Sequence, residues 1–228
     1  FKNKELKVIC IIQARMGSKR LPGKSLKLML GKPMLERIID NIKGSKYVSK
    51  FVVATTRLIE DNPIDDLCNK LKIECFRGDE FDVLSRFVDI SISHKADIIV
   101  RLTADNPFVE KTLLDYMLEK YNKFYTNYDY VHNVQDSGFP FGLFIEIFRY
   151  NALLKAKISE SIEDKEHVTM YFRKNTKKFN IALIKTKNKF KYNYLTVDSH
   201  KDFIHAEGVM SDLYKTKNSF TFYDLMIN

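Results

Sequence analysis

Residues 7–24 carry the clearest signal of the fold, because they combine an apolar run with a basic loop that follows it directly. The run reads Lys7-Val8-Ile9-Cys10-Ile11-Ile12-Gln13-Ala14, and the loop reads Arg15-Met16-Gly17-Ser18-Lys19-Arg20-Leu21-Pro22-Gly23-Lys24. A short apolar segment rich in β-branched residues is typical of a strand buried on both faces, and Gly and Pro mark a loop. The stretch therefore predicts a buried first strand whose carboxyl end carries a cluster of positive charge.

Strands and helices alternate after this first unit. We expect strands at 51–55, 73–76 and 97–102, and helices from Pro33 to Ile42 and at 64–71, 82–94 and 110–121. This alternation predicts an α/β, three-layer, Rossmann-like fold around a largely parallel, mixed central sheet.

The pattern changes after about residue 127. We expect an extended segment at 139–148, a helix at 163–174, a strand at 179–185, a strand end at 194–198 and a final helix at 200–214. We interpret the chain, residues 1–228, as a single domain. Residues 127–150 are expected to form an extension that serves dimerisation or the acceptor side.

Composition narrows the class of protein. The chain is 45% hydrophobic and 29% charged, as globular proteins are. It contains no apolar run near the roughly 18 residues that a membrane helix needs, and Phe1 to Glu5 lack the apolar core of a signal peptide. The odd number and wide spacing of the cysteines favour neither a disulfide framework nor a zinc site. We therefore expect a cytoplasmic protein with no membrane partner.

The net charge of +9 comes mostly from lysine. A solvated lysine-rich face explains it better than a polyanion-binding patch, and steering of an anionic small substrate is a third reading. We therefore expect no nucleic-acid partner. The densest stretch consists of Lys174, Lys177, Lys178, Lys185, Lys187, Lys189 and Lys191.

Three polar clusters follow predicted strands: the 15–24 loop, Asp105 and Asp198. Ligands of open α/β sheets bind at the carboxyl ends of the strands. Glycines let backbone N–H groups approach phosphate oxygens while Arg and Lys neutralise charge, and Mg²⁺ favours one or two carboxylates together with phosphate oxygens. The clusters therefore predict a metal–triphosphate site. Alternatively, each aspartate caps the helix that follows it.

Residues 12–24 resemble the opening signature of bacterial sugar-acid cytidylyltransferases, most closely the spore-coat-polysaccharide type, with the KDO and acylneuraminate cytidylyltransferases as relatives. The resemblance implies a fold of the nucleotide-diphospho-sugar transferase type, usually a homodimer. It also implies an enzyme that uses CTP and Mg²⁺ to make a CMP-linked sugar acid and pyrophosphate, as in polysaccharide biosynthesis. The resemblance continues through residues 77–78, 82–87, 101–107, 166–169 and 195–198.

The resemblance also implies roles for individual residues. Arg15, Lys24 and Asp105 would be catalytic, and Asp105 and Asp198 would hold the metal. Arg77, Glu146 and His167 are candidate contacts for the acceptor substrate. The nucleotide-binding residues would be Gln13, Ala14 and Arg15 beside the base and ribose, Arg15, Ser18 and Lys24 on the triphosphate, and Thr103 near the nucleoside.

Two positions depart from the family pattern. Ala104 stands where a glycine is usual, and Phe141 stands where relatives often carry a basic residue. The acceptor therefore remains open between a sugar acid and a phosphorylated metabolite, which would give a CDP conjugate. A nucleotide-sugar-dependent glycosyltransferase is a further alternative, although such enzymes usually carry D-x-D, and Thr103 replaces its first carboxylate.

Overall fold

The computed structural model describes residues 6–159, 161–215, 217 and 219–227. The opening segment Phe1 to Glu5, in which the sequence shows no apolar signal core, lies outside the described residues. No helix in the described part of the chain is long and apolar enough to cross a membrane.

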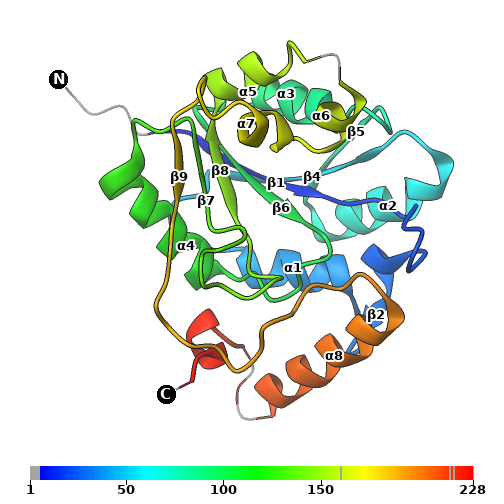
Figure 1. The fold of residues 1–228 in the computed structure, drawn as a ribbon. Coiled ribbons are helices and arrows are strands. Elements are labelled where there is room, and N and C mark those ends of the chain that lie inside the picture. The colour runs from blue at the N-terminus through cyan, green and yellow to red at the C-terminus, as the bar shows by residue number, and fades with distance from the viewer. Residues whose placement is uncertain (1–5, 160, 216, 218, 228) are drawn as a thin grey trace.

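A seven-stranded mixed sheet forms the centre of the fold, in the order β5-β4-β1-β6-β8-β7-β9 (Figure 1). The strands β5, β4, β1 and β6 are parallel, whereas β8 runs antiparallel to both β6 and β7. The largely parallel, mixed sheet of the prediction is confirmed. The strands are β1 (Val8–Gln13), β4 (Lys50–Thr56), β5 (Glu74–Gly78), β6 (Ile98–Thr103), β7 (Tyr130–His132), β8 (Glu146–Arg149) and β9 (Ile181–Leu183), and a separate hairpin pairs β2 (Leu28–Met29) with β3 (Lys32–Pro33).

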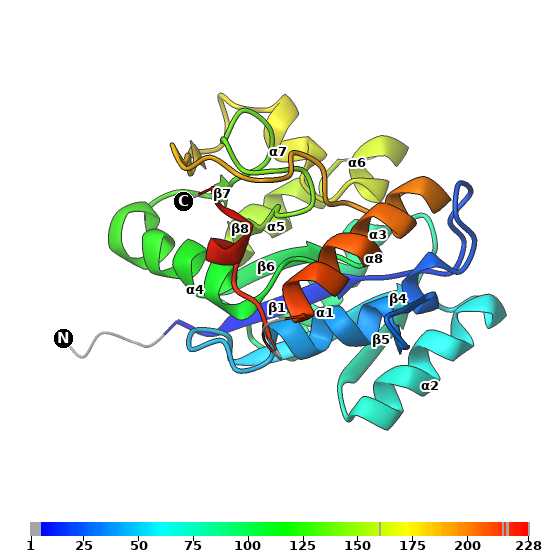
Figure 2. The ribbon, with the colours of Figure 1, turned by 90° about the horizontal axis from the view of Figure 1, so that it is seen from below.

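Helices cover both faces of the sheet and complete three layers, which Figures 1 and 2 show from two sides. One face packs against α1 (Met34–Ile42), α2 (Asn62–Leu71), α4 (Lys111–Lys120) and α8 (His200–Tyr214). The other packs against α3 (Val83–Ser93), α5 (Tyr150–Ala156) and α7 (Met170–Lys174), with α6 (Ile162–Glu166) beside α3. Shorter turns are η1 (Lys24–Leu26), η2 (Ile59–Asp61), the π-helical η3 (Tyr121–Tyr125) and η4 (Phe222–Leu225).

The first strand divides its side chains between the two helical layers. Cys10 and Ile12 belong to the core on the α1 side, and Ile9 and Ile11 to the core on the α3 side. All four are fully buried. Because successive strand residues point to opposite faces, the nearly continuous apolar run is what a strand covered on both sides requires.

Three predicted elements in the second half need correction. Residues 163–174 form two short helices rather than one, because the chain breaks at His167–Thr169, where Val168 is fully buried and the Thr169 hydroxyl donates to buried Glu146. Only 146–149 of the predicted 139–148 segment is strand. Residues 194–198 form a single bridge, from Tyr194 to Phe141, rather than a strand end.

Neither β7 nor α5 was predicted from the sequence. Both are shorter than the stretches over which periodicity gives a clear signal. Since β7 and β8 pair with each other and with the central sheet, residues 127–150 supply two of its strands.

The chain order of the parallel strands creates a switch point between β1 and β6. From β1 the chain adds β4 and then β5 on one side, and it then returns to add β6 on the other side. The last residues of the two central strands, Gln13 and Thr103, pair in register. Open α/β sheets bind ligands in the crevice at such a point, so the fold directs attention to the loops that follow these two residues.

Candidate active site

A cleft of about 390 Å³ lies at this switch point. Every residue predicted to bind nucleotide or metal lines it, together with His167. Arg101 and Ser25 also line it, although neither was among the predicted site residues. The full lining consists of Gln13, Ala14, Arg15, Ser18, Lys19, Arg20, Lys24, Ser25, Arg101, Thr103, Ala104, Asp105, His167 and Asp198.

The basic loop is held in shape by contacts at both of its ends. The Met16 N–H donates to buried Asp61 at 2.7 Å, and the Ser25 hydroxyl donates to the Arg15 carbonyl at 3.0 Å. Gly23 adopts a left-handed conformation, with φ 69°, just before the η1 turn that begins at Lys24. Glycine adopts this conformation without steric cost. The loop therefore presents its charged side chains from a fixed backbone.

Lys24 joins the loop to the two predicted metal ligands. Its ammonium donates to Asp105 Oδ2 at 3.1 Å, to Asp198 Oδ1 at 3.2 Å and to the Val197 carbonyl at 3.0 Å. The Lys24 side chain is 15% exposed, and the two carboxylates are 28% and 24% exposed. Three segments far apart in the sequence therefore meet at one ammonium group.

The Asp105 side chain is oriented by Thr103, the last residue of β6. The Thr103 hydroxyl donates to Asp105 Oδ1 at 2.5 Å and accepts from the Asn106 side-chain amide at 3.0 Å. The Val197 N–H donates to the Asp105 carbonyl at 2.8 Å, which fixes the segment of Asp198 beside it.

The alternative roles of the two aspartates as helix caps are wrong. Glu110 caps α4, with its side chain accepting from two backbone N–H groups of the first turn. Ser199 caps α8 in a reciprocal capping box with Asp202. Since other residues satisfy the helix ends, the carboxylates of Asp105 and Asp198 are directed to the cleft.

The pair of aspartates suits a metal ion that brings its own phosphate ligands. Among the described residues, no group of three or more His, Cys, Asp and Glu side chains is arranged to hold a metal. Mg²⁺ takes one or two protein carboxylates and completes its shell with phosphate oxygens and water. Asp105 and Asp198 share one cationic partner, the Lys24 ammonium, so their oxygens already converge on the position of a cation.

Other charged residues surround this centre. The Arg20 guanidinium lies 3.0 Å from Asp198 Oδ1. The Arg15 guanidinium lies 3.8 Å from Glu166 Oε1, and the side chains of Arg15 and Glu166 are each 42% exposed. The Arg101 guanidinium donates to the Gln13 side-chain oxygen at 3.1 Å. Because Arg101 lies within a buried strand pattern, its position in the sequence gave no sign that its head group reaches the cleft.

Glu146 lies behind the cleft in a buried ion cluster. It forms salt bridges with Arg101 and with Arg173, the latter at 2.7 Å, and accepts from the hydroxyls of Tyr130 at 2.5 Å and Thr169 at 2.7 Å. Burial alone would raise the pKa of Glu146, but the two guanidiniums and these hydroxyls lower it to about 2. The carboxylate is therefore ionised, and it holds the Arg101 side chain that contacts Gln13.

Arg77 lies outside the cleft lining. Its guanidinium donates to the backbone carbonyls of Thr56, at 2.9 Å, and Leu58, at 2.7 Å. It therefore braces the turn between β4 and η2, and η2 carries Asp61. Arg77 is thus connected to the basic loop through the backbone of this turn.

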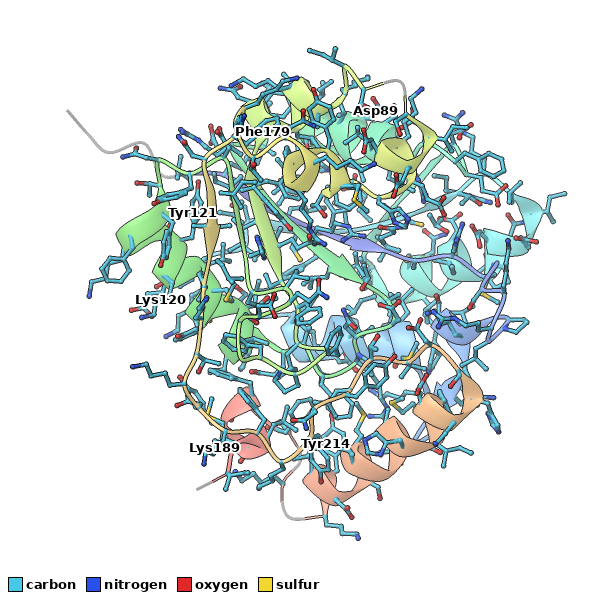
Figure 3. All side chains as sticks on the ribbon, in the orientation of Figure 1. Asp89, Lys120, Tyr121, Phe179, Lys189 and Tyr214 are labelled. Carbon is cyan, nitrogen blue, oxygen red and sulfur yellow. The ribbon has the colours of Figure 1, made fainter. Side chains whose placement is uncertain are left out.

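The lysine-rich stretch runs away from the cleft. Figure 3 labels Phe179 beside α7 and Lys189 near the C-terminal turn, so the stretch crosses from one layer to the other. Lys174 pairs with Glu163 at 2.5 Å, and the Lys191 ammonium donates to the Asp224 carbonyl at 3.1 Å. The stretch is therefore spread over the surface, with Lys174 and Lys191 each bound to a partner of its own, and does not form one concentrated basic patch.

Comparison with known proteins places the chain in a family. The cytidylyltransferase family matches residues 9–221. The spore coat polysaccharide biosynthesis protein SpsF of Bacillus subtilis is 33% identical over 204 residues, which cover 86% of this chain and 83% of that protein. A solved cytidylyltransferase structure from Leptospira borgpetersenii has a TM-score of 0.89 and 31% identity, covering 96% of this chain and 92% of that one.

A more distant structure shares the fold. The structure of CMP:2-keto-3-deoxy-manno-octonic acid synthetase complexed with CTP has a TM-score of 0.69 at 18% identity and covers 90% of this chain and 99% of its own. Fold and cleft together thus define a nucleotidyltransferase of Rossmann-like type. The chain belongs to the cytidylyltransferase family, and within that family it is SpsF-like.

Proposed function

We propose that this protein transfers CMP from CTP to a sugar acid with release of pyrophosphate, in the biosynthesis of a surface polysaccharide or glycoconjugate. The observation that carries the proposal is the meeting of Lys24 with Asp105 and Asp198 beneath the basic loop. A cation position between two carboxylates, next to a phosphate-binding loop, is what transfer of a nucleotidyl group needs. The similarity to SpsF, a spore coat polysaccharide biosynthesis protein, supports the proposed pathway. The shared fold with a synthetase solved in complex with CTP supports CTP as the nucleotide.

In this proposal Asp105 and Asp198 would hold Mg²⁺, which would supply neutralisation of the negative charge on the phosphates. Gln13 and Ala14 contact the nucleoside, while Arg15, Ser18 and Lys24 bind the triphosphate. Thr103 orients Asp105 through their hydrogen bond.

The reaction is an in-line displacement at the α-phosphorus. A bond forms between an acceptor oxygen and this phosphorus, the bond to the pyrophosphate oxygen breaks, and the acceptor proton passes to water. Lys24 and Arg15 offset the negative charge that builds up on the phosphates. Such transfers depend mainly on positioning and on fixed charge, which the braced loop supplies.

Arg101 favours a sugar acid as the acceptor. Its head group lines the cleft, where it donates to the Gln13 side-chain oxygen at 3.1 Å. Guanidinium groups bind carboxylates with paired hydrogen bonds. His167 also lines the cleft and is a further candidate contact for the acceptor. A phosphorylated metabolite, which would give a CDP conjugate, is the second candidate because guanidinium also binds phosphate.

The test is a pyrophosphate-release screen of the four nucleoside triphosphates against sugar acids and phosphorylated metabolites, with Mg²⁺ and with a chelator. We expect release only with CTP, a sugar acid and Mg²⁺. Release with a phosphorylated metabolite instead would select the CDP-conjugate reaction. Release of a nucleoside diphosphate from a nucleotide sugar would indicate a glycosyltransferase and overturn the proposal.

We further propose that the protein is a cytoplasmic homodimer in which residues 127–150 contribute to the subunit interface or to the acceptor side. The support is an exposed aromatic pair at this segment: Phe141 is 45% exposed, Tyr194 is 41% exposed, and their stacked rings lie 6.0 Å apart. We expect sedimentation equilibrium to give twice the chain mass, and Phe141→Asp to shift the protein toward monomer. A monomeric wild-type protein at micromolar concentration would refute this assembly.

A further inference from the structure

We propose that the Lys24 ammonium is the resident cation of the Asp105–Asp198 pair in the nucleotide-free enzyme, so that a divalent metal ion enters this site only together with the triphosphate. This inference rests on the metal–triphosphate site of the proposed function. It adds the state of the site before substrate binds and the order in which its two ligands arrive.

The geometry at the lysine head group is the first support. An ammonium has three N–H donors, and Lys24 has three acceptors within 3.2 Å, namely one oxygen of each aspartate and the Val197 carbonyl. The ammonium therefore lies between the two carboxylates with every donor engaged. A metal ion held by the two aspartates would need that space.

The charge balance is the second support. Asp105 and Asp198 carry two negative charges, and Lys24 and Arg20 place two positive charges within 3.2 Å of them. A bare metal ion would approach a neutral cluster rather than a negative one. It would also have to displace an ammonium whose side chain is only 15% exposed, leaving two like charges close together with no new anion to separate them.

The triphosphate removes both obstacles. It brings several negative charges to the basic loop, so a displaced ammonium finds phosphate oxygens as new partners while the metal takes the carboxylates. The lysine stem is long and flexible, whereas Asp105 is fixed by Thr103 and the Asp198 segment by the Val197 N–H. The Lys24 side chain can therefore move away while the two carboxylates stay in place when the metal and the nucleotide arrive.

The experiment measures Mn²⁺ binding to the nucleotide-free protein at constant ionic strength, from the electron paramagnetic resonance signal of unbound Mn²⁺. Wild type and Lys24→Arg are expected to bind Mn²⁺ weakly. Lys24→Met is expected to bind it at least about ten-fold more tightly, because an ammonium no longer repels the ion. The matched control is Lys19→Met, which removes the same charge from the same loop and the same cleft and should bind as wild type does.

Two results would overturn the inference. The first is that wild type binds Mn²⁺ as tightly as Lys24→Met does, and the second is that Lys19→Met tightens Mn²⁺ binding as much as Lys24→Met does. If Lys24→Met does not fold, Lys24→Gln, which keeps a donor for the Val197 carbonyl, takes its place. The measurement uses neither CTP nor acceptor, so its failure is separate from that of the proposed reaction, which would show as absent pyrophosphate release.

A second readout separates this role from a merely structural one. In Lys24→Met, metal binding should improve while pyrophosphate release falls by about 100-fold, because the triphosphate loses a charge contact that forms in the transition state. Damage to the fold would weaken both properties together. Parallel loss of Mn²⁺ binding and of turnover would therefore also contradict the assignment of Lys24 as the resident cation.

Discussion

Replacing Asp105 with Asn is expected to lower the rate of pyrophosphate release from CTP by about 100-fold or more, the range seen when one preorganised charge contact to a transition state is lost. In the proposed site the Asp105 carboxylate both accepts from Lys24 at 3.1 Å and faces the position of the metal ion. Asparagine keeps the size of the side chain but removes its charge. The measurement is the initial rate of pyrophosphate release at saturating CTP and Mg²⁺.

Asp40→Asn is the matched control for this experiment. Asp40 has the same exposed fraction as Asp105, 28%, and is also paired with a lysine, Lys32, at 2.7 Å. It lies on α1, outside the cleft lining. The control should keep near-wild-type turnover, and both variants should keep the circular dichroism spectrum of the wild type. A near-wild-type rate of pyrophosphate release by Asp105→Asn would contradict the catalytic role of Asp105.

Replacing Glu146 with Gln is expected to lower the free energy of unfolding by about 3 kcal/mol or more at pH 7, since removing one partner of a buried ion cluster leaves the other charges unpaired. The Glu146 side chain is 6% exposed and is the shared partner of Arg101 and Arg173. A glutamine amide would direct N–H donors at guanidinium donors. Denaturant unfolding of both proteins measures the difference.

The difference should depend on pH in a defined direction. Arg101 and Arg173 hold the pKa of Glu146 at about 2 against the effect of burial, whereas an unfolded glutamate titrates near about 4.3. A lowered pKa in the folded state gives stability that is present above the unfolded pKa and is lost as pH falls toward 2. The stability gap between wild type and Glu146→Gln should therefore narrow between about pH 4.3 and pH 2.

Glu163→Gln is the control for burial. Glu163 also pairs with a cation, Lys174 at 2.5 Å, but its side chain is 56% exposed. Exposed ion pairs contribute about 0–1 kcal/mol, so this variant should unfold almost as the wild type does. If Glu146→Gln and Glu163→Gln lower the free energy of unfolding equally, the buried cluster stabilises the fold no more than an exposed ion pair does.

The fold of the first half could be predicted from sequence because its signals are local. The run from Val8 to Gln13 has the composition of a strand covered on both faces, and Leu35, Ile38, Ile39 and Ile42 recur at helical spacing; the structure buries all four of them. Periods of two and 3.6 residues depend only on neighbours along the chain. The placement of the basic loop and Asp105 at adjacent strand ends followed from the same reasoning.

The second half depended on contacts that no local pattern reports. The predicted helix at 163–174 breaks where Thr169 reaches Glu146, 23 residues away. In the first half, too, the anchor of the basic loop is a distant contact, from the Met16 N–H to Asp61, 45 residues along the chain. Glu146 was predicted as a substrate contact, and the structure places it in a buried cluster with Arg101 and Arg173. Pairings between distant segments are fixed by packing, so sequence spacing alone does not reveal them.

We could infer from the sequence the buried first strand, the basic loop after it and two aspartates that suit a metal–triphosphate site. The position of Lys24 between those aspartates became apparent only in the folded chain, because they are 81 and 174 residues away along the sequence. The identity of each side chain and the local periodicity can be read directly from the order of the residues. The position of one ammonium between two carboxylates depends on how the strand ends and the segment before α8 pack together at the switch point.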